Sequence, residues 1–329
     1  MTKENGNYIE IAKEIIPPGR SQIIEIPVSR LPTQTVLSLP ITVVNGIKPG
    51  PKLWLSAAIH GDELNGVEII RQVLEKVKPE TLRGTLFAVP IVNVFGFIEQ
   101  SRYLPDRRDL NRSFPGSETG SLASRLANLF MREIVNQCTH GIDLHTAAIH
   151  RVNLPQIRAN LEDKATYEVA KAFGTEVIIH ASTRDGSLRQ AATKKGIPIL
   201  LYEAGEALRF DNQAIATGVE GIFRVMNCLE MSNFSPPAPS VPTEVSQSKW
   251  IRASRGGIFH LAVQLGETVQ KKQRLGFITD AFGQKIQWIS ASVSGIVISY
   301  ILNPLVNQGD AIVHIAITDS TINSTKSNL

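Results

Sequence analysis

The sequence predicts an α/β protein, with a mixed open sheet flanked by helices and followed by a small all-β barrel. Two observations support this fold class. In the first 234 residues, short apolar runs alternate with helix-like segments, which is typical of a sheet covered by helices. After a proline-rich break, the chain is rich in glycine and in short β-like segments. We therefore expect two regions of different architecture.

The elements of the first region follow one another as strands and helices. Side chains at helical spacing predict helices over residues 64–77, which end before Pro79, and over residues 122–134. Residues 49–51, Pro-Gly-Pro, are expected to form a turn, and residues 141–145 a loop or the end of a strand. The expected strands are short runs rich in Ile, Val and Leu, at residues 21–28, 36–44, 53–59, 85–92, 176–180 and 198–202.

The second region begins after a linker at residues 235–248, which contains the segment SPPAPSVP. It also contains an internal repeat, because Ala253-Ser254 and Gly257-Ile258 recur as Ala291-Ser292 and Gly295-Ile296. Two similar β units predict a barrel closed by two interlocked halves. The expected domains are residues 1–234 for the α/β region, 249–317 for the barrel, and 318–329 for a polar tail.

Composition excludes several classes of protein. Hydrophobic residues make up 43% of the 329 residues and charged residues 19%, as in a soluble globular protein. The net charge of +4 is dispersed, so we expect no nucleic-acid partner. The two cysteines are far apart, which favours reduced thiols and a cytoplasmic location. The N-terminus lacks an apolar signal core and the apolar runs are too short to span a bilayer, so no membrane partner is expected.

Three residues suggest a metal site. His60 and Glu63 are three residues apart, directly after an apolar strand, where an imidazole nitrogen and a carboxylate oxygen can converge on one cation. His145 ends a second strand-like segment. A set of two histidines and one glutamate leaves a coordination position open for water, which is typical of catalytic zinc. Asp143 could orient His145, or could cap the following segment.

His60 and His145 could instead be structural residues, because a lone histidine is more often structural than a ligand and the HxxE spacing alone is common. The position of His60 directly after an apolar strand favours the metal hypothesis. The other histidines lack that context, and we expect them to be structural or surface residues: His140, His150, His180, His260 and His314.

Two further segments suggest a substrate site. Residues 102–112 contain four arginines, which either belong to a solvated loop or bind a substrate carboxylate through their guanidinium groups. Glu203 ends an apolar strand, where partial desolvation suits a general base. Alternatively, Glu203 caps a helix or forms an ion pair, and Glu206 competes for the catalytic role.

Together these segments resemble the succinylglutamate desuccinylase/aspartoacylase family, which has a zinc carboxypeptidase-like fold. The matching motifs lie in the family's order between residues 60 and 205. They are His-Gly-Asp-Glu from His60 with Asn65-Gly66, Asp109-Leu110-Asn111-Arg112, Asp143-Leu144-His145 and Glu203-Ala204-Gly205. The resemblance implies a zinc-dependent deacylase that hydrolyses the amide bond of an N-acyl amino acid or a related N-acyl amine and releases a carboxylic acid.

The resemblance also implies roles for individual residues. His60, Glu63 and His145 would hold one Zn²⁺ per chain, which makes residues 1–234 a zinc-dependent catalytic domain. Asn111 and Arg112 would bind the substrate carboxylate, and Glu203 would act as base and proton shuttle. The arginine that polarises the carbonyl would be Arg102 or Arg108, and the sequence leaves both open.

Several alternatives stay open at this point. A metallocarboxypeptidase acting on a small peptide would use the same scaffold, and a binding protein could have kept the fold without activity. The partner is expected to be a small molecule, and the chain could also form a homo-oligomer. The barrel is expected to be a lid over the site or an oligomer contact. It also resembles biotinyl and lipoyl carriers, although Lys285 lacks the flanking methionines of a biotinylation site.

Overall fold

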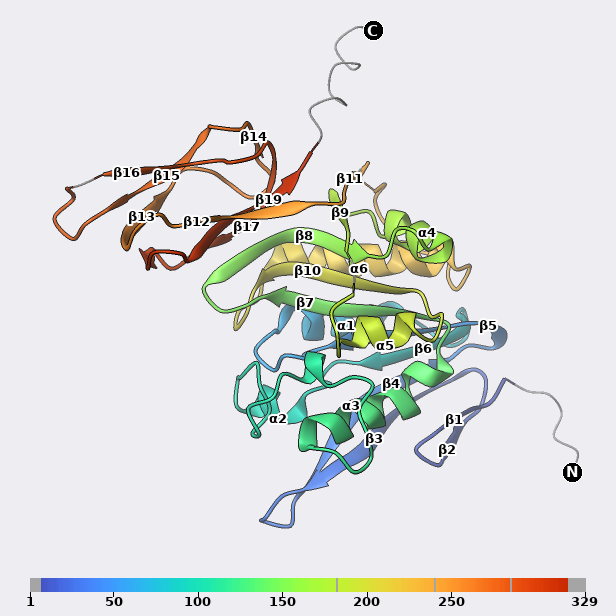
Figure 1. Ribbon diagram of the computed structural model, residues 1–329. Coiled ribbons are helices and arrows are strands. Elements are labelled where there is room, and N and C mark those ends of the chain that lie inside the picture. The colour runs from blue at the N-terminus through green and yellow to red at the C-terminus, as the bar shows by residue number, and fades with distance from the viewer. Residues whose placement is uncertain (1–6, 182, 240, 285, 319–329) are drawn as a thin grey trace, which may run out of the picture.

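The computed structural model describes residues 7–181, 183–239, 241–284 and 286–318. Lys285 and most of the expected polar tail, residues 319–329, therefore lie outside the described residues. A large mixed sheet runs through the molecule in the order β12-β19-β17-β8-β10-β7-β5-β6-β4-β3 (Figure 1). Its first-region strands are β3 (Arg20–Arg30), β4 (Val36–Asn45), β5 (Lys48–Ala57), β6 (Arg83–Val89), β7 (His140–Ala147), β8 (Arg151–Ala159), β9 (Val177–His180) and β10 (Ile199–Glu206).

Four neighbouring strands at the centre of the sheet, β10, β7, β5 and β6, are parallel. Parallel strands are joined by crossover helices and buried on both faces, which explains their continuous apolar sequences. The helices and short 3₁₀ turns of this region are α1 (Asn65–Lys76), α2 (Val94–Ile98), η1 (Leu110–Arg112), α3 (Leu122–Glu133), η2 (Val135–Gln137), α4 (Lys164–Phe173), α5 (Leu188–Thr193) and α6 (Asn212–Cys228).

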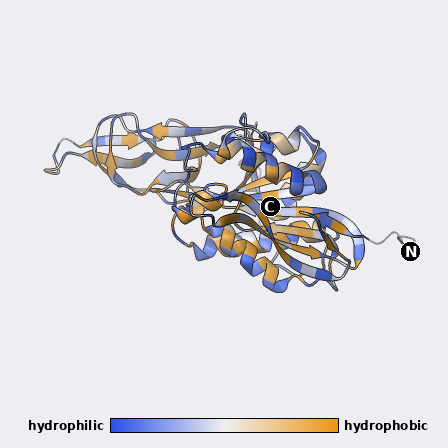
Figure 2. Cartoon of the chain, turned by 90° about the horizontal axis from the view of Figure 1, so that it is seen from below, coloured by the Kyte–Doolittle hydropathy of each residue, from blue (hydrophilic) through white to orange (hydrophobic). Residues whose placement is uncertain are grey.

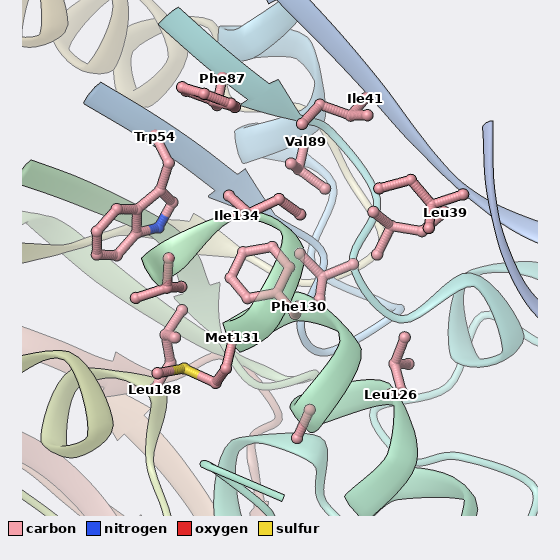
Figure 3. Close-up of a cluster of buried hydrophobic side chains, with 14 of the residues drawn as sticks. Leu39, Ile41, Trp54, Phe87, Val89, Leu126, Phe130, Met131, Ile134 and Leu188 are labelled. Atoms are coloured by element: carbon pink, nitrogen blue, oxygen red, sulfur yellow. The ribbon is translucent and has the colours of Figure 1, made fainter. Parts of the chain in front are cut away.

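The helices cover both faces of the sheet, so two hydrophobic layers form (Figure 1). Helices α1, α4 and α6 pack on one face, and α2, α3 and α5 pack on the other. Figure 2 shows that hydrophobic and hydrophilic residues alternate along the helices, as expected of helices with one buried side. Figure 3 shows the second layer, in which Phe130 and Met131 of α3 lie near Trp54, Phe87 and other sheet residues.

The C-terminal strands form two layers around a separate hydrophobic cluster. One layer, β12, β19, β17 and β14, belongs to the large sheet because β17 pairs with β8. The other layer is a four-stranded sheet in the order β16-β15-β13-β18. These strands are β12 (Ser248–Arg252), β13 (Gly257–Leu261), β14 (Thr268–Val269), β15 (Arg274–Thr279), β16 (Gln287–Ser290), β17 (Gly295–Ile301), β18 (Leu305–Val306) and β19 (Ala311–Ile317).

The two units of the sequence repeat have matching strand pairings. β13 pairs with β15 and β18, and β17 pairs with β19 and β14. Each unit's short strand therefore pairs with the other unit. The expected linker is not free of structure, because β11 (Thr243–Val245) pairs with β9 of the first region. In the part of the chain that the structure describes, the large sheet continues from the first region into the C-terminal strands through the pairing of β8 with β17.

The main sequence-based elements are present, but two local predictions differ from the structure, and strand β8 and an N-terminal hairpin were not predicted. The expected turn at residues 49–51 lies inside β5, where an irregular register accommodates it. Residues 141–145 are the middle of β7. Strand β8 was not predicted, because Asn, Gln and Arg interrupt the apolar pattern of its sequence. An additional hairpin, β1 (Ile9–Ile11) and β2 (Glu14–Ile16), was also missed.

Candidate active site

The predicted metal ligands lie at the carboxyl ends of adjacent parallel strands, where ligands bind in open α/β sheets. His60 and Glu63 occupy the turn between β5 and α1, and His145 belongs to β7, which pairs with β5. The turn requires a glycine at position 61, because a Cβ there would lie 1.9 Å from the backbone carbon of Gly96. This close approach holds His60 and Glu63 against the sheet edge.

The three side chains are brought together and are almost fully buried. One carboxylate faces both imidazole rings: the distance from Glu63 Oε1 to His60 Nδ1 is 2.6 Å, and from Glu63 Oε2 to His145 Nδ1 it is 2.7 Å. The potential ligand atoms of the three residues all lie within 4.8 Å of one another. Two nitrogens and a carboxylate oxygen in this arrangement form a donor set that suits a divalent transition metal.

Each imidazole is also held from its far side. His145 Nε2 donates to Asp143 Oδ2 at 2.8 Å, and His60 Nε2 donates to Asp109 Oδ1 at 3.2 Å. Carboxylates only accept, so with a metal ion on the Nδ1 side, which faces Glu63, each ring would carry its proton on Nε2 and donate it to the aspartate. Asp143 is itself anchored by the hydroxyl of Ser56 at 2.7 Å. Sequence reasoning considered Asp143 for this position, but it assigned no separate function to Asp109.

The charges in this cluster compensate one another. Burial would raise the pKa of Glu63, but His60 and His145 hold it well below its ordinary value. Burial likewise opposes ionisation of Asp109, and the neighbouring His60 and Arg102 lower its pKa. Asp62 differs, because burial and the charge of Glu63 raise its pKa. The site therefore keeps Glu63 ionised, as a metal ligand must be.

The two candidate arginines, Arg102 and Arg108, differ in their position relative to the candidate metal site. Arg102 NH2 donates to Asp109 Oδ2 at 3.0 Å, and Arg102 NH1 lies 3.6 Å from Glu63 Oε1, at the edge of the donor set. Arg108 is exposed and pairs with Asp106 at 3.7 Å, outside the cleft that the other residues line. The structure thus brings Arg102, and not Arg108, to the candidate metal site.

Asn111 and Arg112 lie in the turn η1 and line the same cleft. Asn111 Oδ1 accepts from the backbone N–H of Leu188 at 3.0 Å, which ties the turn to the start of α5 and leaves the Nδ2 group as a donor. The exposed Arg112 donates to the carbonyl of Asn111 at 2.5 Å. Both side chains are placed so that they could bind an anionic group entering the cleft.

Glu203 is the register partner of His145, because β10 pairs with β7. Residues at one register position point to the same face of a sheet, so Glu203 and His145 face the cleft together. Asn153 Nδ2 donates to Glu203 Oε2 at 2.8 Å. Glu206 instead pairs with Arg209 at 2.8 Å and accepts from the N–H of His150 at 2.9 Å, away from the cleft lining.

The candidate metal ligands and the candidate substrate-binding and catalytic residues line one cleft of about 460 Å³. They are His60, Glu63, His145, Arg102, Asn111, Arg112 and Glu203. Its walls also contain residues that sequence reasoning did not assign to a site, and the C-terminal strands contribute four of them. His314 was expected to be a structural or surface residue, yet it lies in this wall. The additional lining residues with polar side chains are Thr146, Arg151, Asn153, Arg158, Arg184, Ser187, Arg189, Ser248, Trp250, Ser299 and His314.

A buried His-Glu-His group that lines a polar cleft at a sheet edge is able to hold a metal ion, as many hydrolase sites do. A family model of the succinylglutamate desuccinylase/aspartoacylase catalytic domain matches residues 49–229, more than half of the chain. The chain therefore belongs to the succinylglutamate desuccinylase/aspartoacylase family. Members of this family are hydrolases that remove acyl groups from N-acyl amino acids.

Individual relatives support the same assignment. The chain is 25% identical over 292 residues to N-alpha-acetyl-L-2,4-diaminobutyric acid deacetylase from Halomonas elongata, covering 84% of this chain and 85% of that protein. The product-bound structure of the ectoine utilization protein EutE (DoeB) from Ruegeria pomeroyi is similar, with a TM-score of 0.82, 25% identity and coverage of 92% and 98% of the two chains. A succinylglutamate desuccinylase/aspartoacylase structure from Rhodobacter sphaeroides has a TM-score of 0.79, 25% identity and coverage of 91% and 97%.

Both of these structures are matched over more than nine tenths of the chain. Among the described residues, no helix is both long and apolar enough to cross a membrane.

Proposed function

We propose that this protein is a zinc-dependent deacylase that hydrolyses the amide bond of an N-acyl amino acid and releases a carboxylic acid. The observation that supports the proposal is the convergence of His60, Glu63 and His145 in the lining of a cleft that Glu203 also lines. The relative from Halomonas elongata, a deacetylase of an N-acetyl amino acid, supports the same reaction type.

Zinc fits the donor set because both histidines present Nδ1 and have Nε2 occupied by an aspartate, as ligating histidines usually do. His60, Glu63 and His145 would hold the ion. When bound, zinc supplies Lewis acidity, which polarises an amide carbonyl and makes water easier to deprotonate.

The chain's own side chains provide the remaining steps in this proposal. Asn111 and Arg112 bind the carboxylate of the substrate and so orient its amide at the end of β7. Arg102 stabilises the negative charge that develops on the carbonyl oxygen. Glu203 takes a proton from the attacking water and passes it to the departing amine, which cannot leave unprotonated. Asn153 keeps the carboxylate of Glu203 in position for both transfers.

The direct test is hydrolysis of N-acetyl amino acids by zinc-loaded protein, with the released acid and amino acid quantified by chromatography. We expect turnover, its loss after chelation, and its recovery when zinc is restored. Small peptides with a free C-terminus serve as the second substrate set. Efficient cleavage of peptides without cleavage of N-acyl amino acids would replace this proposal by a metallocarboxypeptidase.

A further inference from the structure

Asn65 and Gly66 belong to the first sequence motif, yet neither residue lines the cleft. Asn65 is the first residue of α1 and follows the candidate ligand Glu63 by two positions. Its side chain is almost fully buried, with 1% of its surface exposed. A buried amide is costly unless both of its polar atoms are paired, so the partners of Asn65 show what the residue is used for.

The amide of Asn65 connects the turn that carries the metal ligands to the segment that follows Glu203. Asn65 Nδ2 donates to the carbonyl of Ala204 at 3.2 Å, and the N–H of Asp211 donates to Asn65 Oδ1 at 3.0 Å. The backbone adds a further bond, because the N–H of Leu208 donates to the carbonyl of Asp62 at 2.8 Å. Residues 204–211 are therefore held by the start of α1 as well as by the sheet.

The sheet holds the backbone less regularly from this point onward. Glu203 is the register partner of His145 on β7 and of Gln156 on β8, and the register shifts on both sides directly after it. Such irregularities locally disrupt the ladder of backbone hydrogen bonds. The ladder thus fixes β10 up to Glu203, and the side chain of Asn65 holds the next carbonyl of the strand.

Two glycines allow the close approach of α1 and β10. A Cβ at Gly66 would lie 2.7 Å from the Cβ atoms of Ala57 and Leu144, so the glycine lets the start of α1 lie close to the sheet. Gly205 has a φ of +74°, in the left-handed region, and a Cβ there would lie 2.5 Å from Asn65 Nδ2. The motif glycines at positions 66 and 205 therefore serve the same contact.

The metal ligands have contacts of their own that do not involve Asn65. The carboxylate of Glu63 faces both imidazoles and accepts from the N–H of Thr146 at 3.2 Å. Glu203 is only half-buried, and its carboxylate accepts from Asn153. Loss of the two bonds of Asn65 should therefore displace Glu203 and leave the metal ligands in place.

We propose that Asn65 is a positioning residue that sets the distance between the metal ligands and Glu203 through the carbonyl of Ala204. This inference rests on the proposed deacylase function, in which Glu203 moves a proton from the attacking water to the departing amine. Both transfers require hydrogen-bond distance, and a misplacement of about 1 Å can lower a rate by about a hundredfold. Asn65 lies outside the cleft lining, so it acts through Glu203 and not on the substrate.

The first test is Asn65→Ala in the zinc-loaded protein. Alanine favours the helix and removes both side-chain bonds. We expect kcat for N-acetyl amino acids to fall by about tenfold or more, while KM and zinc content stay near those of the wild type.

Asn45→Ala is the matched control for this variant. Asn45 is also buried, donates to the carbonyls of Asn7 and Ile16, and lies outside the cleft. Its removal should lower the melting temperature and leave kcat unchanged. If kcat fell equally in both variants, loss of stability would explain the effect and the inference would be wrong.

A double-mutant cycle tests whether Asn65 acts through Glu203. In the Glu203→Gln enzyme, Asn65→Ala should lower kcat by only about twofold or less, because the base that Asn65 positions is already absent. If Asn65→Ala slowed this enzyme as much as it slows the wild type, the inference would be overturned and the deacylase function would stand.

Asn65→Asp provides a second variant in case the alanine protein does not fold. Aspartate has the same size and can still accept from the N–H of Asp211, but it has no N–H for the carbonyl of Ala204. It should lower kcat and show the same lack of additivity with Glu203→Gln. Wild-type kcat in the aspartate variant would contradict the role of the bond to Ala204.

Crystal structures of the zinc-loaded variants keep the two proposals distinguishable. Glu203 should be displaced relative to His145 in the Asn65 variant and unmoved in Asn45→Ala. If the wild type hydrolysed no N-acyl amino acid, the proposed function would fail, whereas a displaced Glu203 would still support the positioning role. An unmoved Glu203 in the Asn65 variant would overturn the inference whatever the activity.

Discussion

At the metal end of the cleft, each imidazole contacts two carboxylates, whereas at the C-terminal end some buried polar atoms have no hydrogen-bond partner among the described residues. His145, for example, contacts both Glu63 and Asp143, and Asp143 is anchored by Ser56. By contrast, Ser299 and His314 each keep a buried atom unpaired. The same sheet thus carries one end with a satisfied network and one end without it.

This difference shows how the two ends would serve a ligand. Metal ligands must be oriented before the ion binds, and a surrounding network of hydrogen bonds achieves this. A group that recognises substrate must instead keep its hydrogen-bonding capacity free until the substrate arrives. Substitutions at the metal end should therefore change metal content, whereas substitutions at the other end should change substrate preference alone.

The largest effect is expected for His145→Ala. Removal of one of three ligands should abolish most zinc binding and lower kcat/KM by about a thousandfold, because the metal supplies several kcal/mol of transition-state stabilisation. Elemental analysis and steady-state kinetics measure the two effects. His140→Ala is the matched control, since His140 lies at the start of the same strand and outside the cleft. Full zinc content in the His145 variant would refute the proposed ligand set.

Glu203→Gln should lower kcat by about a hundredfold or more while zinc content stays near that of the wild type. The amide keeps the shape of the side chain but cannot accept and return a proton, which is the usual contribution of a general base. Glu206→Gln is the control, because Glu206 pairs with Arg209 outside the cleft lining. If Glu206→Gln abolished turnover and Glu203→Gln did not, the general base would be Glu206 and not Glu203.

Asp143→Asn should weaken zinc binding by about 10–100-fold, the usual effect of losing a partner of a ligating histidine. The asparagine removes the negative charge beside His145 and no longer fixes the tautomer of the ring. Competition with a chelator of known affinity measures the change. Asp106→Asn provides the comparison, since Asp106 contacts only the exposed loop around Arg108. Unchanged affinity in the Asp143 variant would mean that the network at the metal end is not needed for orientation.

A smaller effect is expected for Arg112→Lys, which should raise KM by about tenfold and change kcat little. Lysine keeps the positive charge but lacks the planar fork that binds a carboxylate through two hydrogen bonds. Arg108→Lys is the control and should leave KM unchanged, because Arg108 is exposed and lies outside the cleft. If Arg112→Lys left KM unchanged, as Arg108→Lys should, Arg112 would not bind the substrate carboxylate.

The residues at the metal end could be predicted from the sequence because they lie at or near the ends of strands whose apolar runs are evident in the sequence. His60 and Glu63 follow the apolar strand β5, and His145 lies within β7, so periodicity and strand order place them at one sheet edge. The choice between Arg102 and Arg108 could not be made this way. Both belong to an irregular loop, and only the packed structure shows that Arg102 contacts Asp109 and Arg108 does not.

What the sequence by itself determined was the α/β alternation, the repeat in the C-terminal region and the set of potential metal ligands, because each of these depends on spacing along the chain. The tertiary structure alone decided that the C-terminal strands extend the catalytic sheet. That arrangement depends on hydrogen bonds between β8 and β17, whose paired residues Asn153 and Ser299 are almost 150 positions apart. Backbone hydrogen bonds do not depend on side-chain identity, so the pairing of β8 with β17 could not be predicted from the residue pattern. The polar sequence of β8 is explained only once its side chains are seen to line a cleft.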